Sequence, residues 1–534
     1  MNPKATPSRC LVVLALLGLT ACSSGPTKAA WNGPPPEYEA PRKGPGSAPA
    51  TSAAALPDDD DGMDMPPYGS VQDLSASIDA YSKGFGSRYG VAYAPSGVLM
   101  ISHDGKTIVT RAYGKVKQPD GAAPTAGTRF RIGSVTKPIV ATLALKMVED
   151  KTISLSDSVR KWVTELPESY QPITIHHLLS QTSGVASYTE PGGLLDRKME
   201  DVPQKDVLAW LAKKAPDAPD GKTPRPFSYS NSNYYLLGVV LERAGKAPLG
   251  QLLSTRVLGP AEMKSAGVDA QANDAVGYMR SPKDELVPAD VISPSLPFGA
   301  GFLRASAEDL LALDRAYDGT KLLSDASKAK MWTPVSKDYG YGWVVGDIGG
   351  SKIEWHNGAI DGFQSFYGRA PDQKVAVVYV GNVFDFDATR FGLDVLKMAM
   401  TGSSIAAPVE RDTVPVDDAF GKLVAGEYVL DAKSKKEMEK QVPAPVIESI
   451  AGITISFDQG VIAAKPTGQG QFPLKRAADG TTLFHPTIKV ELAFDVTKKG
   501  EKSETSSFTL KQGGIVAKYV RGKAPKPKKP PAKK

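Results

Sequence analysis

Three serines in this chain stand three residues before a lysine, in the pairs Ser134–Lys137, Ser158–Lys161 and Ser327–Lys330. On a helix, residues i and i+3 lie on one face, so each hydroxyl could meet its amine. A serine hydroxyl beside a proton acceptor is a nucleophile for acyl transfer. Because the spacing occurs three times, it does not select one pair, and the surrounding sequence must do so.

The context favours Ser134. It follows the short β-like run "TRFRIG", comes directly after a glycine and opens an apolar helical segment. The backbone amides at the start of a helix lack intrahelical partners, so the Ser134 N–H can donate to a developing oxyanion. Ser158 lies in the polar stretch "SLSDSVRKW" and Ser327 in "SDASKAK", which is typical of a surface. We therefore predict that Ser134 is the nucleophile and that Lys137 lies beside it.

A second candidate group is Tyr229 with Asn231 in "PFSYSNSNYYLLG", the only Tyr-x-Asn in the chain. A phenol whose pKa is lowered by a nearby ammonium can accept or donate a proton, and a carboxamide can orient a lysine or a substrate amide. Taken alone, the pattern is more typical of a packed aromatic residue beside a capping asparagine.

A third candidate group is His356-Asn357-Gly358, at the end of a β-like run in "EWHNGAIDGFQSF". The same His-x-Gly form occurs at residues 103–105, so this pattern is also weak in isolation. A strand here would present its edge to a substrate, with Gly358 allowing close approach and the amide of Ala359 directed into a cleft.

In this order and spacing, the three motifs resemble those of the class C β-lactamase-related serine hydrolases. That family includes β-lactamases, penicillin-binding DD-carboxypeptidases, D-aminopeptidases and esterases. Several blocks are similar to family blocks in family order: "FRIGSVTKP", "ITIHHLLSQTSGV", "FSYSNSNYYLLGVVLE", "ASAEDLLAL" and "WHNGAIDGFQSFYGRAPDQKVAVVYVGN". The resemblance covers roughly residues 75–402. The remainder is similar, more loosely, to the lipocalin-like β domains that some members carry.

The resemblance implies a role for each residue. Ser134 would attack a carbonyl and form an acyl-enzyme, while Lys137 and Tyr229 share its proton and pass it to the leaving group. Either of these two could be the resting base. The amides of Ser134 and Ala359 would form an oxyanion hole, and Asn231 would position Lys137 and the acyl side chain. Water would then release the acyl group.

One departure from the family concerns His356. β-Lactamases of the family and most penicillin-binding relatives have Lys-Thr-Gly where this chain has His-Asn-Gly. Histidine is largely neutral at pH 7, so we expect weaker recognition of a free substrate carboxylate. The sequence therefore favours a serine hydrolase acting on an ester, a D-amino-acid peptide or a related amide. The alternatives are a true β-lactamase or DD-carboxypeptidase, and a non-catalytic lipoprotein that binds peptidoglycan or a partner.

The elements that must position these residues predict an α+β domain over residues 67–403. Strand-like runs occur near both ends of this stretch, at 96–102 and 106–114 and again at 351–358, 363–371 and 374–382. Helical patterns occupy the middle, as at 137–150, 233–245 and 306–317. We expect one antiparallel sheet joining the early and late strands, flanked by helices and a helical insert, with the site between the two parts.

Residues 404–521 have a different pattern, in which short alternating runs are separated by turn residues. This predicts a small all-β domain of barrel or sandwich type.

Two segments expected to be disordered flank the folded parts. Residues 22–66 are rich in Pro, Gly, Ala and Ser and indicate a disordered linker, and residues 522–534 form a disordered lysine- and proline-rich tail.

The first 21 residues have a short basic start and an apolar core too brief to span a bilayer, which is typical of a secretory signal. "LTAC" resembles the lipobox of bacterial lipoproteins, so we expect cleavage before Cys22 and its lipidation. Cys22 would then be the only cysteine left, and no disulfide could form. We expect a bacterial envelope protein, anchored to the membrane by this lipid, in the outer membrane and facing the periplasm.

Charge and composition limit the other partners. The formal net charge is +6, and removing the six tail lysines and two basic signal residues leaves about −2, so no nucleic-acid partner is indicated. We expect a small-molecule or peptide substrate, no cofactor and no metal. His176 and His177 diverge on a helix and favour packing roles, and His485 has no evident partner. The oligomeric state stays open.

Overall fold

The computed structural model describes residues 66–523, apart from residues 86–92, 191, 217–225, 282, 284, 409, 441, 443, 468 and 501. The expected signal segment, the Cys22 lipidation site, the linker up to residue 65 and the tail from residue 524 lie outside the described residues. None of the described helices is long and apolar enough to span a bilayer.

The first folded part is built on a six-stranded antiparallel sheet in the order β2-β1-β10-β9-β8-β7. Its strands are β1 (Gly97–His103), β2 (Lys106–Tyr113), β7 (Val344–Ile348), β8 (Ser351–Ile360), β9 (Phe363–Ala370) and β10 (Val375–Gly381). β1 pairs along its whole length with β10, from Gly97 opposite Gly381 to His103 opposite Val375. This confirms the sequence-based prediction of a sheet that joins early and late strands.

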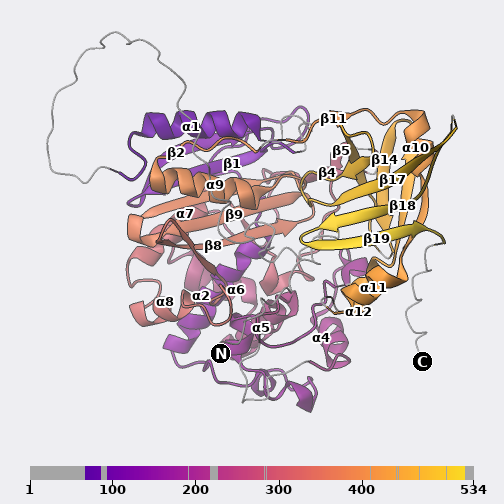
Figure 1. Ribbon diagram of the computed structural model, residues 1–534. Helices are drawn as coiled ribbons and strands as arrows, with labels where there is room; N and C mark the ends of the chain where they lie inside the picture. Colours follow the sequence, from indigo (N-terminus) through magenta and orange to yellow (C-terminus); the bar gives the residue numbers. More distant parts are fainter. Residues whose placement is uncertain are drawn as a thin grey trace, which may run out of the picture.

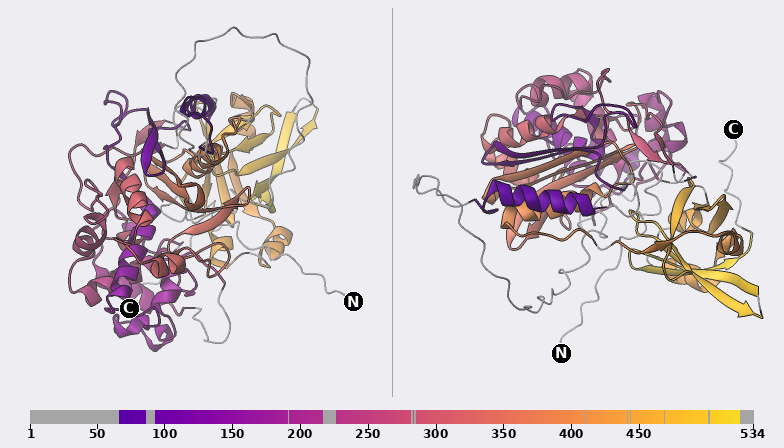
Figure 2. Two further views of the ribbon diagram at one scale, coloured as in Figure 1. Left: turned by 90° about the vertical axis from the view of Figure 1, so that its left-hand side faces the viewer. Right: turned by 90° about the horizontal axis from the view of Figure 1, so that it is seen from above.

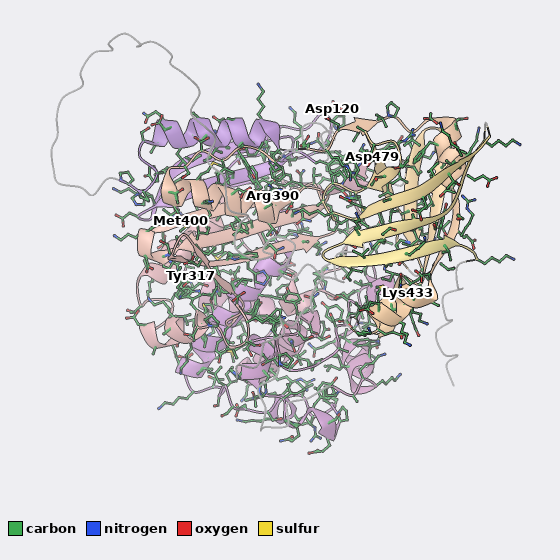
Figure 3. All side chains as sticks on the ribbon, in the orientation of Figure 1. Asp120, Tyr317, Arg390, Met400, Lys433 and Asp479 are labelled. Atoms are coloured by element: carbon green, nitrogen blue, oxygen red, sulfur yellow. The ribbon has the colours of Figure 1, made fainter. Side chains whose placement is uncertain are left out.

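Helices cover both faces of this sheet (Figures 1 and 2). Side chains of β1 alternate between the two faces because successive residues in a strand point in opposite directions. Leu99 and Ile101 pack with α1 (Val71–Gly84) and α9 (Ala388–Thr401), whereas Val98 and Met100 belong to the larger core of the helical insert. Arg390 and Met400 mark the two ends of α9 in Figure 3.

The chain between β2 and β7 forms the helical insert. Its helices are α2 (Thr136–Glu149), α3 (Ile175–Leu179), α4 (Gln204–Ala212), α5 (Asn231–Gly245), α6 (Leu249–Leu253), α7 (Ala307–Asp318) and α8 (Asp325–Met331). Short helical turns are η3 (Gly133–Val135), η4 (Val159–Lys161), η5 (Glu168–Tyr170), η6 (Leu195–Arg197), η7 (Ser254–Leu258) and η8 (Phe298–Ala300), and η9 (Pro371–Gln373) lies between β9 and β10. Two small ribbons complete it: β3 (Phe130–Arg131) with β6 (Arg304–Ala305), and β4 (Tyr278–Arg280) with β5 (Leu286–Pro288).

The C-terminal part is a closed eight-stranded antiparallel barrel in which each strand pairs with the next and β19 pairs back with β12. Its strands are β12 (Gly426–Leu430), β13 (Gly452–Asp458), β14 (Val461–Pro466), β15 (Phe472–Ala477), β16 (Thr482–Phe484), β17 (Glu491–Lys499), β18 (Lys502–Gln512) and β19 (Ile515–Arg521). β11 (Thr413–Val414) extends it beside β15. The all-β character of this part was predicted from the sequence, but none of the alternating runs identified there covers β15.

The barrel also carries three short helices that the sequence analysis did not predict: α10 (Asp418–Val424), α11 (Ala432–Met438) and α12 (Ala444–Ser449). Lys433, on α11, and Asp479, in the turn between β15 and β16, lie on opposite sides of the barrel in Figure 3. Aromatic rings pack together in the barrel interior: Phe508 is tilted against Tyr428 at a centroid distance of 4.9 Å and stacked on Tyr519 at 5.0 Å.

His485 lies where the barrel meets the first part, which corrects the expectation that it has no partner. Its ring packs edge-on against Tyr93, and its Nε2 lies 3.7 Å from a carboxylate oxygen of Asp385. Burial and the positive charges of Arg280 and Lys475 lower the pKa of His485 to about 3. The sequence missed these contacts because they come from residues that are distant along the chain.

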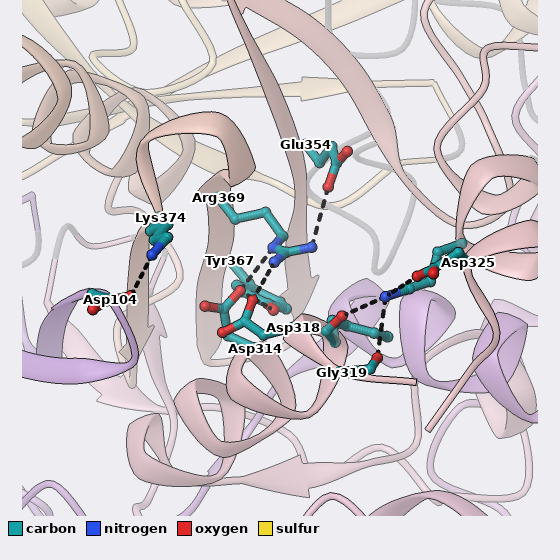
Figure 4. A network of polar contacts seen from close by, with 11 residues as sticks. Asp104, Asp314, Asp318, Gly319, Asp325, Glu354, Tyr367, Arg369 and Lys374 are labelled. Atoms are coloured by element: carbon teal, nitrogen blue, oxygen red, sulfur yellow. Dashed lines mark hydrogen bonds and ion pairs between the residues drawn. The ribbon is translucent and has the colours of Figure 1, made fainter. Parts of the chain in front are cut away.

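A buried ion network fixes α7 to the sheet strands that lead into the site (Figure 4). Arg369 of β9 donates to the Asp314 carboxylate at 2.8 Å and lies 3.4 Å from Glu354 of β8, and Tyr367 donates to Asp314 at 3.0 Å. The Arg369 guanidinium also lies 4.9 Å from the ring centroid of Trp332. Buried charges need such pairing because their removal from water is unfavourable.

Removing one member of this network should destabilise the domain. We expect Asp314→Asn to lower the free energy of unfolding by about 3 kcal/mol, since Arg369 stays buried with one counter-charge fewer. Urea unfolding followed by tryptophan fluorescence measures this, because the described tryptophans all lie between residues 162 and 355. The matched control is Asp104→Asn, which breaks the exposed pair with Lys374 in the same view. Equal effects of the two substitutions would contradict the prediction.

Candidate active site

Ser134 lies in the turn η3, directly before α2, and is buried. Lys137 is the second residue of α2, so one helical turn brings its Nζ to 2.8 Å from the Ser134 Oγ. The helix here follows from its sequence, which is mostly apolar after Pro138 and is buried on nearly every side. The Ser-x-x-Lys spacing therefore produces a direct contact between hydroxyl and ammonium.

The other two Ser-x-x-Lys pairs do not form such a contact. The Ser158 hydroxyl donates to the backbone oxygen of Gln171, and Lys161 pairs with the carboxylate of Asp157. The Ser327 backbone N–H donates to the Ser324 hydroxyl, which caps α8. The local sequence therefore distinguished the pair that forms a direct contact from the other two, whereas the spacing alone did not.

The Lys137 ammonium is fully buried, with 0% of the residue exposed, and three oxygen acceptors surround it. Besides the Ser134 hydroxyl, it donates to the Asn231 Oδ1 at 2.9 Å and to the backbone oxygen of Ala300 at 2.8 Å. The sequence analysis missed Ala300, which ends η8. The glycines of "PFGAG" were the available signal, because a Cβ on Gly299 would lie 2.5 Å from the backbone oxygen of Tyr234 in α5.

The Tyr229 hydroxyl, 95 residues further along the chain, donates to the Ser134 Oγ at 3.0 Å. Its ring lies over the site, with the Lys137 Nζ 5.0 Å from the ring centroid. Phe227 and Tyr339 pack against the same ring at centroid distances of 6.4 and 6.3 Å. This packing restricts the phenol to the position at which it meets the serine.

Asn231 is the first residue of α5, and neighbouring hydroxyls fix its carboxamide. Its Nδ2 donates to the Thr189 Oγ1 at 3.0 Å, and its backbone N–H donates to the Ser187 Oγ at 3.3 Å. Because the nitrogen faces Thr189, the oxygen faces Lys137. Neither Ser187 nor Thr189 was predicted from the sequence, since nothing in "GVASYTE" points to Asn231 across 42 residues.

The strand β8 closely approaches the turn that carries Ser134, and two glycines allow this. A Cβ on Gly358 would lie 2.0 Å from the backbone oxygen of Ile132, and a Cβ on Gly133 would lie 2.9 Å from the amide nitrogen of Ala359. Gly133 also has a φ of +48°, which favours glycine. The close contact brings the amide of Ala359 beside the serine turn.

His356 lies in β8, directly before Asn357, and is fully buried, with 0% of the residue exposed. Its Nδ1 donates to the backbone oxygen of Asn357 at 2.6 Å, which leaves Nε2 to accept from the Tyr339 hydroxyl at 3.1 Å. Burial, together with the Lys137 charge, lowers the pKa of His356 to about 3. The ring is therefore neutral at pH 7, and its nitrogens face Tyr339 and the strand backbone.

Tyr339 was not predicted as part of the site. Its ring lies 6.0 Å from the His356 ring and 5.1 Å from the Phe227 ring. Burial raises its pKa well above the ordinary value for tyrosine, so the hydroxyl stays protonated and can donate to His356. No pattern in "VSKDYGYGW" marked it, because its role depends on a contact with another strand.

The remaining histidine candidates have structural contacts. The His177 Nδ1 lies 3.0 Å from the Thr174 hydroxyl and completes a capping box at the start of α3, and the His176 Nδ1 lies 2.6 Å from the Tyr341 hydroxyl. Among the residues that the structure describes, no three His, Cys, Asp or Glu side chains are grouped so that they could hold a metal ion.

The geometry thus combines a serine hydroxyl, a buried ammonium, a phenol and backbone amides within one small volume. A hydroxyl that contacts two proton-transfer groups can attack a carbonyl carbon, and nearby amides can stabilise the oxyanion. The arrangement is suited to acyl transfer.

Comparisons with known proteins agree with this chemistry. The Beta-lactamase family model matches residues 87–397. A penicillin-binding protein of Bacillus subtilis is 23% identical over 457 residues, covering 80% of this chain and 95% of its own. A D-aminopeptidase of Cereibacter sphaeroides is 25% identical over 322 residues, covering 58% of this chain and 61% of its own.

A solved structure shows the same fold. The octameric penicillin-binding protein homologue from Pyrococcus abyssi superposes with a TM-score of 0.56 at 18% sequence identity, covering 84% of this chain and 99% of its own. Because the first folded part makes up less than 84% of the chain, the matched region extends into the C-terminal part.

The buried neutral His356 predicts how stability depends on pH. An unfolded chain binds a proton on this histidine below pH 6.5, whereas the folded protein does so only near pH 3, so stability falls as the pH falls through this range. Between pH 7 and pH 5, the free energy of unfolding should decrease in both proteins. We expect this decrease to be about 2 kcal/mol smaller in His356→Gln than in the wild type. Urea unfolding followed by tryptophan fluorescence at both pH values measures this. An unchanged pH dependence in the variant would refute the prediction.

Proposed function

Because this chain belongs to the β-lactamase family of serine hydrolases, whose members similar to it include a penicillin-binding protein and a D-aminopeptidase, we propose that Ser134 is its acylated nucleophile. The proposed substrates are an ester, a D-amino-acid peptide or a related amide. The observation that supports this most is that the Ser134 Oγ lies 2.8 Å from the Lys137 Nζ and 3.0 Å from the Tyr229 hydroxyl.

In the proposed reaction, the Ser134 oxygen forms a bond to the substrate carbonyl carbon while its proton moves to the neighbouring base. The amides of Ser134 and Ala359 stabilise the oxyanion, and each such donor contributes about 3 kcal/mol to the rate. The proton then passes to the leaving group as its bond to carbon breaks. A water molecule, deprotonated by the same base, attacks the acyl-enzyme and releases the acid.

We assign the base role to Tyr229, in a reactive form of the site in which Tyr229 is a phenolate and the Ser134 hydroxyl donates to it, the reverse of the hydrogen bond in the structure. The three hydrogen atoms of a Lys137 ammonium match its three acceptors, Ser134, Asn231 and Ala300, so Lys137 is the positively charged member of the pair. An ammonium close to a phenol favours the phenolate. Tyr229 is thus the group that receives the serine proton, and Asn231 positions Lys137.

The neutral His356 supports the choice of substrate class. A lysine at this position would present a permanent positive charge to a carboxylate on the substrate, and a buried neutral imidazole does not. His356 instead holds Tyr339 beside Tyr229. We therefore propose substrates that need no ion pair here, such as esters and amides, rather than the free carboxylate of a β-lactam.

The second candidate is a true β-lactamase or a penicillin-binding DD-carboxypeptidase, which the similarity to a penicillin-binding protein favours. A non-catalytic lipoprotein that binds peptidoglycan or a partner is the third. The three motifs are all present: Ser134, Lys137, Asn231 and Tyr229 are joined by hydrogen bonds, and the His356 ring lies 6.3 Å from the Tyr229 ring, which argues against this last alternative.

The proposed function predicts the effect of replacing each catalytic residue. We expect purified protein to react with a fluorophosphonate and to hydrolyse p-nitrophenyl esters, and Ser134→Ala to abolish both. Tyr229→Phe and Lys137→Met should each lower kcat/KM by about 100- to 10,000-fold, because each removes a proton-transfer group or its charge. Ser158→Ala is the matched control and should retain full activity.

The pattern of substrates separates the candidate functions. Ester or D-amino-acid amide turnover with slow penicillin reaction supports the proposal. Rapid turnover of a penicillin would favour a β-lactamase, and stable labelling by fluorescent penicillin would favour a DD-carboxypeptidase. No Ser134-dependent reaction with any probe would overturn the enzymatic proposal.

We further propose that the protein is anchored in the bacterial envelope through lipid on Cys22, in the outer membrane and facing the periplasm. The lipobox-like "LTAC" supports this, together with the position of Cys22 ahead of a long linker. Expressed as the full chain, the wild type should fractionate with membranes, and Cys22→Ala should become soluble or remain as an uncleaved precursor. A mature, processed Cys22→Ala protein in the membrane fraction would contradict lipidation.

A further inference from the structure

The segment that carries Tyr229 lies outside the helices and strands. Residues 226–230 lead into α5 without regular secondary structure, so other parts of the chain must accept their backbone N–H groups. Two of these groups, those of Ser228 and Ser230 on either side of Tyr229, donate to one residue, Gln181. Gln181 comes shortly after α3 and is fully buried, with 0% of the residue exposed.

The two hydrogen bonds use different oxygens of Gln181. The Ser228 N–H donates to its backbone oxygen at 2.9 Å, and the Ser230 N–H donates to its Oε1 at 3.0 Å. In an extended chain, the N–H groups of residues i and i+2 point to the same side, and Ser230 is extended, with φ −93° to be contrasted at the cap of α1 and φ −141° here. Gln181 thus contacts the Tyr229 segment as a neighbouring strand would, and we call this pair of hydrogen bonds the glutamine clamp.

The backbone of Gln181 has an uncommon conformation. Its φ is +60°, in the left-handed region that residues other than glycine rarely adopt. Such a conformation is unfavourable by itself and persists where the surrounding contacts compensate for it. The glutamine clamp supplies two such contacts.

Neighbouring side chains fix which end of the Gln181 carboxamide faces the clamp. The Asn233 Nδ2 donates to the Gln181 Oε1, and the Ser183 hydroxyl donates to the Asn233 Oδ1. Because Asn233 presents its nitrogen, Gln181 must present its oxygen. The side-chain oxygen of Gln181 is therefore held where the Ser230 N–H meets it.

Tyr229 itself lies among four titratable side chains from different elements. The Lys137 Nζ lies 5.0 Å from its ring centroid, and the rings of His356 and Tyr339 lie 6.3 Å from it. Burial lowers the pKa of His356 to about 3 and raises the pKa of Tyr339 and of the nearby Tyr234 well above the ordinary value, so these three are neutral at pH 7. An ammonium lowers the pKa of a nearby phenol, so the distance between Tyr229 and Lys137 determines how readily Tyr229 becomes a phenolate.

We propose that Gln181 is a positioning residue for the reaction. By holding the amides on both sides of Tyr229, it keeps the phenol within reach of the Ser134 hydroxyl and close to the Lys137 charge. Packing by Phe227 and Tyr339 restricts the Tyr229 ring, and the glutamine clamp fixes the backbone from which that ring projects. The inference rests on the proposed function, because it assumes that Tyr229 receives the serine proton.

The test removes the side-chain half of the clamp in the purified protein. Gln181→Met keeps the length of the side chain and the backbone oxygen but offers no acceptor to the Ser230 N–H. We expect it to lower kcat/KM for p-nitrophenyl acetate about 10- to 100-fold, because a small displacement of a reacting group has a large effect on rate. Gln181→Asn should show a similar loss, since its oxygen is one methylene short and asparagine tolerates the left-handed region well.

The pH profile separates a displaced Tyr229 from a general structural defect. Activity that requires the Tyr229 phenolate rises with pH as the phenol loses its proton. A phenol displaced from Lys137 loses its proton at higher pH, so the acid limb of kcat/KM in both variants should move up by about one pH unit. A loss of folded protein would instead lower kcat/KM at every pH and leave this limb in place.

Two further variants serve as rescue and control. Gln181→Glu should recover most of the activity lost in Gln181→Met, because a carboxyl group in either protonation state offers an oxygen to the Ser230 N–H. Gln469→Met makes the same substitution at a buried glutamine of the barrel, whose Nε2 donates to the Ser449 backbone oxygen, and it should leave both kcat/KM and the pH profile unchanged. Circular dichroism establishes that each variant is folded.

The outcomes distinguish this inference from the proposed function. If the wild type hydrolyses the ester in a Ser134-dependent manner but folded Gln181→Met and Gln181→Asn keep the wild-type kcat/KM, the positioning role is wrong and the hydrolase proposal stands. A lower kcat/KM with an unshifted acid limb also overturns the positioning role. If the wild type shows no Ser134-dependent hydrolysis, the proposed function fails and this inference fails with it.

Discussion

The site depends on one buried charge. The Lys137 ammonium lies out of contact with water, and an ammonium transferred from water into a protein interior needs hydrogen-bond acceptors to compensate for its lost hydration. The fold supplies three acceptors from three separate segments: the turn before α2, the start of α5 and the end of η8. Each of these segments is held in place by the others through Lys137, so the charge organises the cleft as well as serving the chemistry.

A second constraint is the contact between backbone and backbone at the serine turn. Gly133 and Gly358 bring β8 close enough that any side chain at either position would collide with the opposing chain. The Ser365 hydroxyl donates to the Ile132 backbone oxygen at 2.8 Å and closes the same contact from β9. The position of the Ala359 amide is thus set by the packing of the sheet strands against the serine turn. The buried Arg369 network holds α7 against the same sheet.

Much of this arrangement was predictable from the sequence. The hydrophobic periods located the strands and long helices, and the unequal surroundings of Ser134, Ser158 and Ser327 favoured the one pair whose hydroxyl and ammonium are in direct contact. Groups that act through the backbone or across the fold were not predictable in this way. Ala300 contributes only a carbonyl oxygen, which every residue has, and Thr189 and Tyr339 become significant only when distant segments meet. That His356 is largely neutral at pH 7 could be predicted because it is a histidine. Its complete burial could not be predicted, because it depends on the neighbouring strand.

The order of strands in the central sheet has a consequence for how the protein acquires activity. β1 and β10 are neighbours in the sheet, although more than 270 residues separate them in the chain. Native contacts between such distant segments form late and slow the folding of a chain. During synthesis, Ser134 emerges long before β8 and β9, whose backbones complete its surroundings. A nascent or truncated chain that ends before residue 381 therefore carries the serine and lysine without a working site. Hydrolytic activity should appear only when nearly the whole first domain has been made.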